Sequence, residues 1–245
     1  PANKVRYEEI QRLNQNGLNG ATRNMSHGYD TIVIGFGGMG SAATASLARR
    51  GRCVLAIEQF DLLHELGSSA GGIRIFRFAY FLDPRYVPLM RRAYDRWAAL
   101  ERDADERLLF TTGGLDIGNA KSEVFNGAKA ACEQHDLPHE ILSAAELMRR
   151  HPAWSVPTDY NAVFQPDAGY LPADRAIAAH ARVALRHGAT IHAREQVIHF
   201  EERSGKVVVT TDRATYEAEQ LVVTAGPWTG TFLPSRSEEH TSELQ

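Results

Sequence analysis

The sequence contains few cysteines and no long apolar run. Among its 245 residues only 2 are cysteines, Cys53 and Cys132, and they form no Cys-x-x-Cys pair. A disulfide framework and a zinc knuckle are therefore excluded, and a reducing, cytoplasmic location is expected. No apolar stretch approaches the roughly 20 residues of a membrane helix. The first residues also lack the apolar core of a signal peptide. We expect no membrane partner.

Excess charge is also absent. The chain carries 27 Lys and Arg against 30 Asp and Glu, a formal net charge of -3. This balance argues against a strongly basic nucleic-acid-binding protein, so no nucleic-acid partner is expected. Apolar residues make up 43% of the chain. At this length they are enough for one or two domains with a sizeable core.

The two ends differ from the rest of the chain. Residues 1–27 are polar with a weak helical pattern, and we expect a non-native or disordered leader. Met25 is then a possible true start, and a genuine N-terminal extension is the alternative. Residues 236–245 resemble a translated DNA-sequencing adapter. We expect the natural protein to continue differently after Leu233, so that these residues are the front part of something longer.

A β-α-β unit opens the main part of the chain. Residues 29–34 are an apolar, β-branched run that predicts a buried strand. Residues 40–50 are small and Ala-rich, which favours a helix, and residues 52–57 predict a second buried strand. Strand, glycine turn, helix and strand within this span require a right-handed crossover and a parallel sheet. The fold class is therefore α/β.

The rest of the chain alternates between predicted helices and strands. Helices are expected at residues 86–101, 121–135, 144–150 and 173–186, the third of them capped by Ser143. Short strands are expected within residues 108–118 and at 161–165, 190–192, 206–210, 215–218 and 221–226. A packing face is predicted on the first of these helices at Val87, Met90, Ala93, Tyr94, Trp97 and Leu100.

A glycine-rich turn follows the first predicted strand. Residues 35–40 read Gly-Phe-Gly-Gly-Met-Gly, a G-x-G-x-x-G motif. Gly35 permits the tight turn, Gly37 lets the backbone approach a pyrophosphate, and Gly40 allows close packing of helix on strand. The helix N-terminal amides, with Gly38 and Met39 between the motif glycines, would then face the phosphates.

An acidic residue ends the second predicted strand, about twenty residues after the glycine turn, as the dinucleotide motif requires. This residue is Glu58, followed by Gln59. A carboxylate here can accept hydrogen bonds from ribose hydroxyls and would repel a 2′-phosphate, which disfavours NADP. The glycine motif and Glu58 are compatible with both NAD and FAD. Two features favour flavin: the hairpin that leads to the last strand, and the small-residue turn at residues 224–228.

The loop after the second strand carries a sharper signal. Residues 67–80 read GSSAGGIRIFRFAY and resemble the corresponding loop of the monomeric sarcosine oxidase and N-methyltryptophan oxidase family. The resemblance extends to YVPL at residues 86–89, TGGL at 112–115, FQPDAG at 164–169 and AGPW at 225–228. It covers residues 29–233 in family order.

The resemblance implies an architecture and an activity. It implies a glutathione-reductase-like Rossmann domain that binds FAD, formed by residues 28–106 and 169–235. It also implies an inserted, incomplete α+β substrate lobe, whose first part is residues 107–168. The activity implied is oxidation of an N-methyl or other secondary amino acid, with O2 as acceptor and H2O2 as product. The full-length protein is expected to be a monomer.

The resemblance also implies roles for individual residues. Arg74 would lie beside the isoalloxazine ring, and Arg77 would hold the substrate carboxylate, for which a guanidinium fork is well suited. The alternative for both is a solvated loop arginine or a salt bridge that contributes little. The other implied contacts with the cofactor are made by Ser68, Ser69, Val197, Ala225, Gly226 and Trp228.

The chain differs from the family at positions that bear on substrate choice and catalysis. Many members have histidine and aspartate where this chain has Ala70 and Gly72. The resemblance also implies that the flavin-tethering cysteine, the oxygen-activating lysine and the rest of the substrate pocket lie beyond these residues. Neither Cys53 nor Cys132 matches that cysteine. The chain is therefore expected to be inactive alone. An NAD-dependent dehydrogenase and a non-catalytic dinucleotide-binding module are the alternatives.

Histidines suggest no metal site. Of the 10 histidines, His135 and His139 are four residues apart, but Leu137 and Pro138 between them break any helix. His180 and His187 are explained as surface residues. We expect no bound metal.

Overall fold

The chain divides into two compact units. The computed structural model describes residues 10, 12 and 28–232. The first unit combines Pro1–Gly72 with Ala173–Gln245, and the second is Ile73–Pro172. The expected leader (residues 1–27, apart from 10 and 12) and the expected adapter-derived tail (residues 236–245) lie outside the described residues, as does Leu233.

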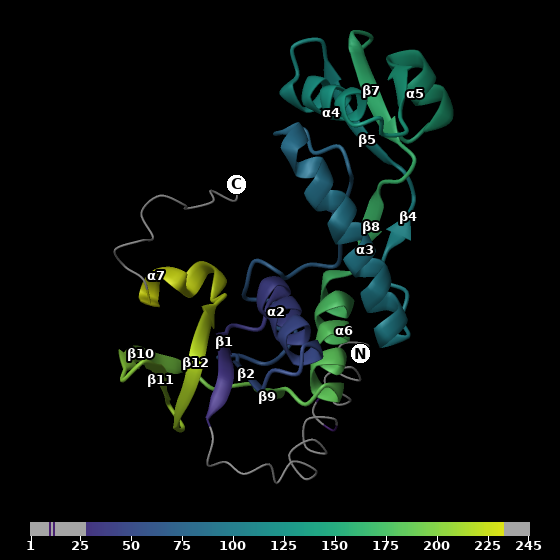
Figure 1. Ribbon diagram of the computed structural model, residues 1–245. Helices are drawn as coiled ribbons and strands as arrows, with labels where there is room; N and C mark the ends of the chain where they lie inside the picture. Colours follow the sequence, from purple (N-terminus) through teal and green to yellow (C-terminus); the bar gives the residue numbers. More distant parts are fainter. Residues whose placement is uncertain (1–9, 11, 13–27, 233–245) are drawn as a thin grey trace. The chain divides into compact units, whose positions relative to one another are not determined.

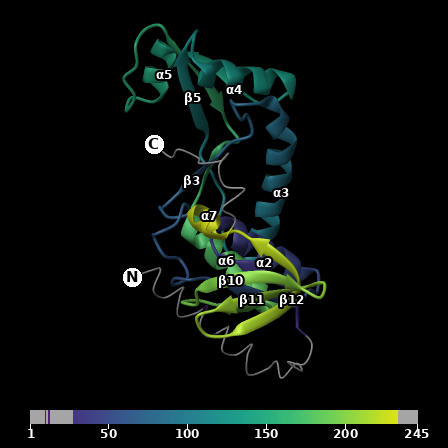
Figure 2. The same ribbon diagram turned by 90° about the vertical axis from the view of Figure 1, so that its left-hand side faces the viewer.

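A six-stranded sheet in the order β10-β11-β12-β1-β2-β9 forms the centre of the first unit (Figures 1 and 2). Its parallel strands are β1 (Tyr29–Ile34), β2 (Val54–Ile57), β9 (Thr190–His192) and the end of β12 (Thr215–Val223). The antiparallel strands at the other edge are β10 (Val197–Arg203) and β11 (Lys206–Thr211). The predicted parallel β-α-β arrangement is therefore confirmed.

Two helices pack against each other beside this sheet (Figure 1). They are α2 (Gly38–Arg49) and α6 (Ala173–Arg186), and α6 matches its predicted range. In contrast, α2 begins two residues before the predicted position, because Gly37 is extended and serves as the N-cap. Gly38 and Gly40 therefore lie in the first helical turn.

The close approach of α2 to β1 depends on two of the glycines. Gly35 has φ +89, in the left-handed region that favours glycine. A Cβ at Gly40 would lie 1.9 Å from the Gly35 carbonyl oxygen and 2.6 Å from Thr224 Oγ1. The roles predicted for Gly35 in the turn and for Gly40 in helix packing are consistent with these distances.

The sheet differs from the prediction in its last strand and in one edge strand. Residues 215–218 and 221–226 were expected to be separate, but β12 is continuous through Val223. It pairs antiparallel with β11 up to Ala218 and parallel with β1 from Ala218 onward. Exposed Glu219 and Gln220 hide this continuity in the sequence. Strand β10 was expected only without bounds, as the start of a strand–hairpin–strand path over residues 195–224. It carries mostly exposed side chains, so it has no apolar pattern.

Cys53 also differs from expectation. It was placed inside a buried strand, yet it lies one residue before β2 and is only half-buried. Its amide donates a 2.7 Å hydrogen bond to Asp30 Oδ2. At Cys53, therefore, the backbone amide is hydrogen-bonded to a polar side chain.

Small antiparallel sheets and three helices make up the second unit. One sheet contains β3 (Arg74–Phe76), β8 (Gly169–Leu171) and β4 (Phe110–Thr111); the other contains β5 (Gly114–Asn119), β7 (Tyr160–Gln165) and β6 (Glu140–Ser143). The helices are α3 (Val87–Ala104), α4 (Glu123–Gln134) and α5 (Ala144–Arg150). The predicted Ser143 cap is confirmed: its Oγ accepts the Glu146 amide at 3.3 Å.

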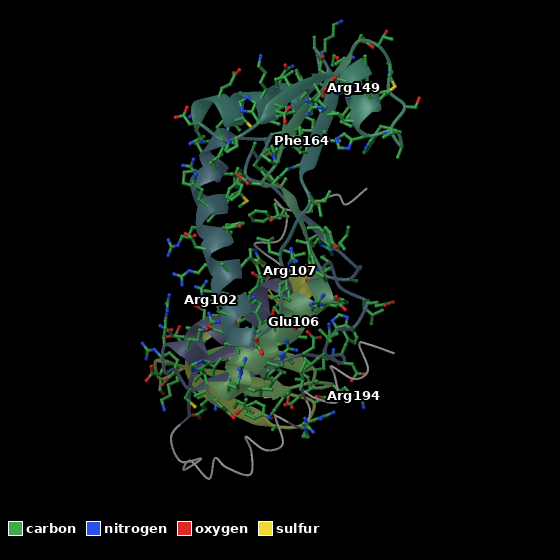
Figure 3. The ribbon with its side chains drawn as sticks, turned by 90° about the vertical axis from the view of Figure 1, so that its right-hand side faces the viewer. Arg102, Glu106, Arg107, Arg149, Phe164 and Arg194 are labelled. Atoms are coloured by element: carbon green, nitrogen blue, oxygen red, sulfur yellow. The ribbon has the colours of Figure 1, made fainter. Side chains whose placement is uncertain are left out.

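The core of the second unit lies between α4 and the strands. Phe125, Ala128, Cys132 and Val163 are among its buried residues. Figure 3 labels Phe164 on β7, which packs against a small cluster around Leu142 and Leu147. It also labels Arg149, an exposed residue of α5. The packing face predicted on α3 is only partly buried: Val87 and Leu100 are buried, whereas Tyr94 is 36% exposed.

The unit boundaries differ from the expected domain limits. Residues 73–106 were expected to belong to the cofactor domain. In the structure β3 pairs with β8, which joins this segment to the second unit. A short 3-10 helix (Gly226–Trp228) and α7 (Thr229–Phe232) follow β12 in the first unit. In residues 28–232, no helix is long and apolar enough to cross a membrane.

The contact at Gly40 leads to a stability prediction. Alanine is the better helix former by about 1 kcal/mol, yet Gly40→Ala should lower the free energy of unfolding by about 2 kcal/mol because its Cβ overlaps the Gly35 carbonyl. Urea unfolding measures the difference. Gly72→Ala is the control, since a Cβ there meets nothing within 4 Å. A Gly40→Ala chain as stable as the wild type would contradict the packing described here.

Candidate cofactor site

A cavity of about 570 Å³ lies in the first unit. Five separate segments line it: the turn after β1, the loop after β2, α6 through Ile177, the segment after β9, and the end of β12 with the turn that follows it. Three of these strands, β1, β2 and β12, contribute their carboxyl ends. This is where open α/β sheets bind their ligands, and the volume falls within the usual range for such sites.

Most of the cofactor-binding residues predicted from the sequence line this one cavity. They are Gly35, Gly37, Gly38, Met39, Glu58, Gln59, Ser68, Ser69, Val197, Ala225, Gly226 and Trp228. Gly40 is not among the lining residues, because it packs against the Gly35 carbonyl. The structure thus brings these segments together. Contact of each residue with a cofactor stays a prediction.

The N-terminus of α2 borders the cavity and suits an anion. Its N-cap, Gly37, supplies no side-chain cap, and the first turn contains no acidic residue. The Gly38 amide donates to Ser69 Oγ at 2.9 Å, which leaves the serine hydroxyl proton to donate elsewhere. Backbone amides together with the helix dipole favour a phosphate at this position. The residues present therefore fit a dinucleotide diphosphate.

Glu58 is a buried carboxylate in the wall of the cavity. It is 5% exposed, its Oε2 accepts the Phe36 amide at 2.8 Å, and its Oε1 accepts the Phe60 amide at 3.0 Å. The Nε2 atom of His64 lies 3.6 Å from Oε1. Two backbone donors thus stabilise and orient the carboxylate, and its remaining lone pairs can accept ribose hydroxyls.

The end of β12 closes another side of the cavity. The Thr224 amide donates to the Ile34 carbonyl at 2.8 Å, and Thr224 Oγ1 donates to the same oxygen at 2.9 Å. Beyond it, the Trp228 ring lies 5.3 Å from the Phe60 ring, centroid to centroid. The Phe60 ring in turn lies 4.8 Å from the His64 ring, centroid to centroid. An aromatic wall therefore joins the β12 turn to the loop after β2.

Sequence reasoning missed several residues of this cavity. Phe36, His64, Glu195 and Gln196 line it, and none of them was singled out. Phe36 acts through its backbone amide, for which the sequence gives no signal. His64 and Glu195 are isolated polar residues in loops, and only the paired strands bring them to the cavity.

The two predicted catalytic arginines, Arg74 and Arg77, belong to the second unit. Arg77 Nη1 donates to Asp116 Oδ1 at 2.6 Å, and its guanidinium carbon lies 5.7 Å from the Tyr80 ring and 5.2 Å from the Phe81 ring. Arg74 Nη1 donates to the Ile73 carbonyl at 2.9 Å. The salt bridge that was the alternative to a substrate contact is therefore present at Arg77, although the sequence does not identify Asp116 as its partner.

Asp116 is 3% exposed and holds Arg77 through a small network. Its Oδ2 accepts Gln165 Nε2 at 2.8 Å, and Gln165 Oε1 accepts the Ala79 amide at 2.9 Å. Burial raises the pKa of Asp116, while Arg77 and Gln165 act in the opposite direction. The network therefore fixes one nitrogen of the Arg77 side chain, which is 25% exposed.

Within the described part of the chain, no three His, Cys, Asp or Glu side chains are grouped so as to hold a metal ion. Burial raises the pKa of the Cys132 thiol to about 11. Cys132 is therefore a protonated core residue near neutral pH.

Parallel strands with a G-x-G-x-x-G turn, a buried acid and a cavity at the strand ends define a dinucleotide-binding domain. The chain belongs to the FAD dependent oxidoreductase (DAO) family, whose profile matches residues 30–242. FAD is therefore the cofactor, and the alternative of an NAD-dependent enzyme is not supported.

Individual relatives agree with this assignment. Monomeric sarcosine oxidase from Streptomyces avermitilis is 40% identical over 221 residues, covering 90% of this chain and 58% of the relative. N-methyl-L-tryptophan oxidase from Yersinia pestis is 35% identical over 207 residues, covering 84% and 56%. The resemblance found in the sequence is thus confirmed. The chain spans little more than half the length of these relatives.

Solved structures share the fold. NikD, described as an unusual amino acid oxidase essential for nikkomycin biosynthesis, is 31% identical with a TM-score of 0.77, over 84% of this chain and 53% of that one. Glycine oxidase from Geobacillus kaustophilus has a TM-score of 0.72 at 22% identity, over 85% of this chain and 58% of that one. The latter likeness concerns the fold alone.

Glu58 leads to a binding prediction. In Glu58→Gln the amide nitrogen opposes one of the two backbone donors, and the charge-assisted hydrogen bonds to a ribose are lost. We expect FAD affinity to fall about tenfold. Quenching of FAD fluorescence on titration gives the dissociation constant. Glu65→Gln, an exposed change in the same loop, should leave it unaltered. Equal affinity for Glu58→Gln and wild type would contradict the assigned role.

Asp116 leads to a pH prediction. Because its pKa is raised in the folded chain, folding favours the protonated carboxyl. The associated stabilisation is present below the ordinary pKa and is lost as pH rises through the raised value. The unfolding free energy of wild type minus that of Asp116→Asn should therefore decrease with rising pH above about 4. Urea titrations at several pH values measure it. An increase would show that pairing with Arg77 outweighs burial.

Proposed function

We propose that this chain carries the FAD-binding part of an oxidase acting on N-methyl or other secondary amino acids. In the proposed reaction the substrate loses a hydride from the carbon next to nitrogen and a proton from nitrogen, giving an imine. O2 takes up two electrons and two protons and becomes H2O2. Bound FAD supplies the two-electron acceptor. The protein supplies binding, orientation and charge.

One observation carries this proposal. Most of the residues predicted to bind the cofactor, from the dinucleotide motif or from the family resemblance, come from four separate segments and line a single cavity. The relatives named sarcosine oxidase and N-methyl-L-tryptophan oxidase support the substrate class. NikD, named as an amino acid oxidase, supports the broader chemistry.

The chain's own residues take the following proposed roles. The α2 amides and Ser69 bind the diphosphate, and Glu58 binds the ribose. Arg77, held by Asp116, binds the substrate carboxylate through its remaining guanidinium donors. Arg74 supplies positive charge that favours reduced flavin. These roles require a carboxylate-bearing substrate.

The two units take different proposed roles. The first is a glutathione-reductase-like FAD-binding domain, and the second is the first part of a substrate lobe. The whole protein is proposed to be a monomer. Because the chain covers little more than half of its relatives, we propose that these residues alone do not turn over substrate.

Anaerobic reduction tests the proposed function. A form extended to the relatives' length is loaded with FAD, and its visible absorption is followed after addition of sarcosine or of glycine, which lacks only the N-methyl group. Sarcosine or another N-methyl amino acid should bleach the flavin, and glycine should not. The 245-residue chain should form no peroxide.

Each other outcome has a distinct meaning. Bleaching by glycine alone contradicts the secondary-amine assignment. Bound flavin that no amino acid reduces favours a non-catalytic dinucleotide-binding module. Peroxide formed by the 245-residue chain contradicts its proposed inactivity.

A further inference from the structure

A second buried carboxylate lies at the edge of the cavity. Glu195 follows β9, is 3% exposed, and lines the cavity with Gln196 and Val197. Neither the sequence motif nor the proposed reaction uses it. A carboxylate buried to this degree is stable only with hydrogen-bond partners, so its partners indicate what it holds in place.

Three side chains contact this carboxylate. Its Oε1 accepts Thr211 Oγ1 at 2.7 Å and the Tyr216 hydroxyl at 2.8 Å, and its Oε2 lies 3.0 Å from His192 Nδ1. Burial and the hydrogen bond to Glu195 raise the pKa of Tyr216, so this phenol remains a donor at neutral pH. Hydrogen bonds to an ionised acceptor are stronger than hydrogen bonds to a neutral one.

The backbone around Glu195 is fastened on both sides. The Glu195 amide donates to the Glu58 carbonyl at 3.0 Å. On the other side, the Gln196 amide donates to Asp212 Oδ1 at 2.9 Å, and the Asp212 amide donates to the Gln196 carbonyl at 3.0 Å. Residues 195–197 therefore form a strap (here called the 195–197 strap) between Glu58 and the β11–β12 turn.

Arg194, the residue before the 195–197 strap, also contacts the loop after β2. The Arg194 amide donates to the Phe60 carbonyl at 2.9 Å, and the Arg194 side chain, labelled in Figure 3, pairs with Asp61. The loop that carries Glu58 and the β11–β12 turn are thus linked through one short segment. Glu195 adds side-chain contacts to this link, because its carboxylate accepts from Thr211 at the end of β11 and from Tyr216 on β12.

We propose that Glu195 is a positioning residue for the adenosine end of the cofactor. By binding Thr211 and Tyr216, it fixes the 195–197 strap at the distance from Glu58 that the nucleoside requires. It acts through the strap backbone and Glu58, not through its own contact with the cofactor. This inference rests on the proposed placement of the ribose at Glu58.

A thermodynamic cycle tests the proposal on the 245-residue chain with ADP as the probe, because ADP is the part of FAD that this end would bind. Isothermal titration gives the dissociation constant for wild type, Glu195→Ala, Thr211→Val and the double variant. We expect about tenfold weaker binding for Glu195→Ala and about fivefold for Thr211→Val. The double variant should also bind ADP only about tenfold more weakly than wild type, because both changes remove the same contact between Glu195 and Thr211.

Conservative variants separate positioning from general stability. Glu195→Gln keeps an oxygen that accepts from Thr211 and Tyr216, and should bind ADP within about threefold of wild type. Thr211→Ser keeps the hydroxyl and should do the same. Glu219→Gln, which neutralises an exposed acid on β12, is the matched control and should have no effect.

The outcomes distinguish this inference from the proposed function. A wild-type chain that binds no ADP contradicts the placement of the cofactor in this cavity. Wild-type binding with an unchanged constant for Glu195→Ala, or additive losses in the cycle, overturns the role of Glu195. If Glu195→Ala does not fold, Thr211→Val decides: a folded variant with wild-type affinity overturns the proposal.

Discussion

The hydrogen bond between Glu58 and the Phe36 amide is the contact on which the cavity depends. It joins the end of β2 to the turn between β1 and α2, 2.8 Å from carboxylate oxygen to nitrogen. A buried carboxylate tolerates burial only when donors surround it, so this bond fixes the glycine turn and the acid together. Phosphate-binding amides and a ribose acceptor therefore face the same cavity.

The remaining walls follow from strand pairing. Because β12 runs parallel beside β1, Thr224 reaches the Ile34 carbonyl, and the following turn closes the cavity. Because β9 runs parallel beside β2, the segment after β9 lies along the loop after β2. Carboxyl ends of neighbouring parallel strands thus bring distant residues together. Glu195 then connects this arrangement to the antiparallel hairpin of β11 and β12.

Much of this cavity was predictable from the sequence because its chemistry is local. The strand-turn-helix of residues 29–50 has a continuous apolar pattern and a glycine spacing with a specific physical purpose. Phe36, His64 and Glu195 were not predictable, since a backbone amide or an isolated polar residue has no pattern. The boundary at Ile73 was missed for a similar reason: β3 is short and half-exposed, and only its pairing with β8 assigns it to the second unit.

A structure of the chain with ADP bound tests the central claim most directly. We predict that the diphosphate oxygens lie about 3 Å from the backbone amides at the start of α2. A ribose hydroxyl should lie at the same distance from Glu58. A ligand bound in the cavity with its phosphates away from α2, or with Glu58 contacting only Phe36 and Phe60, would contradict the account.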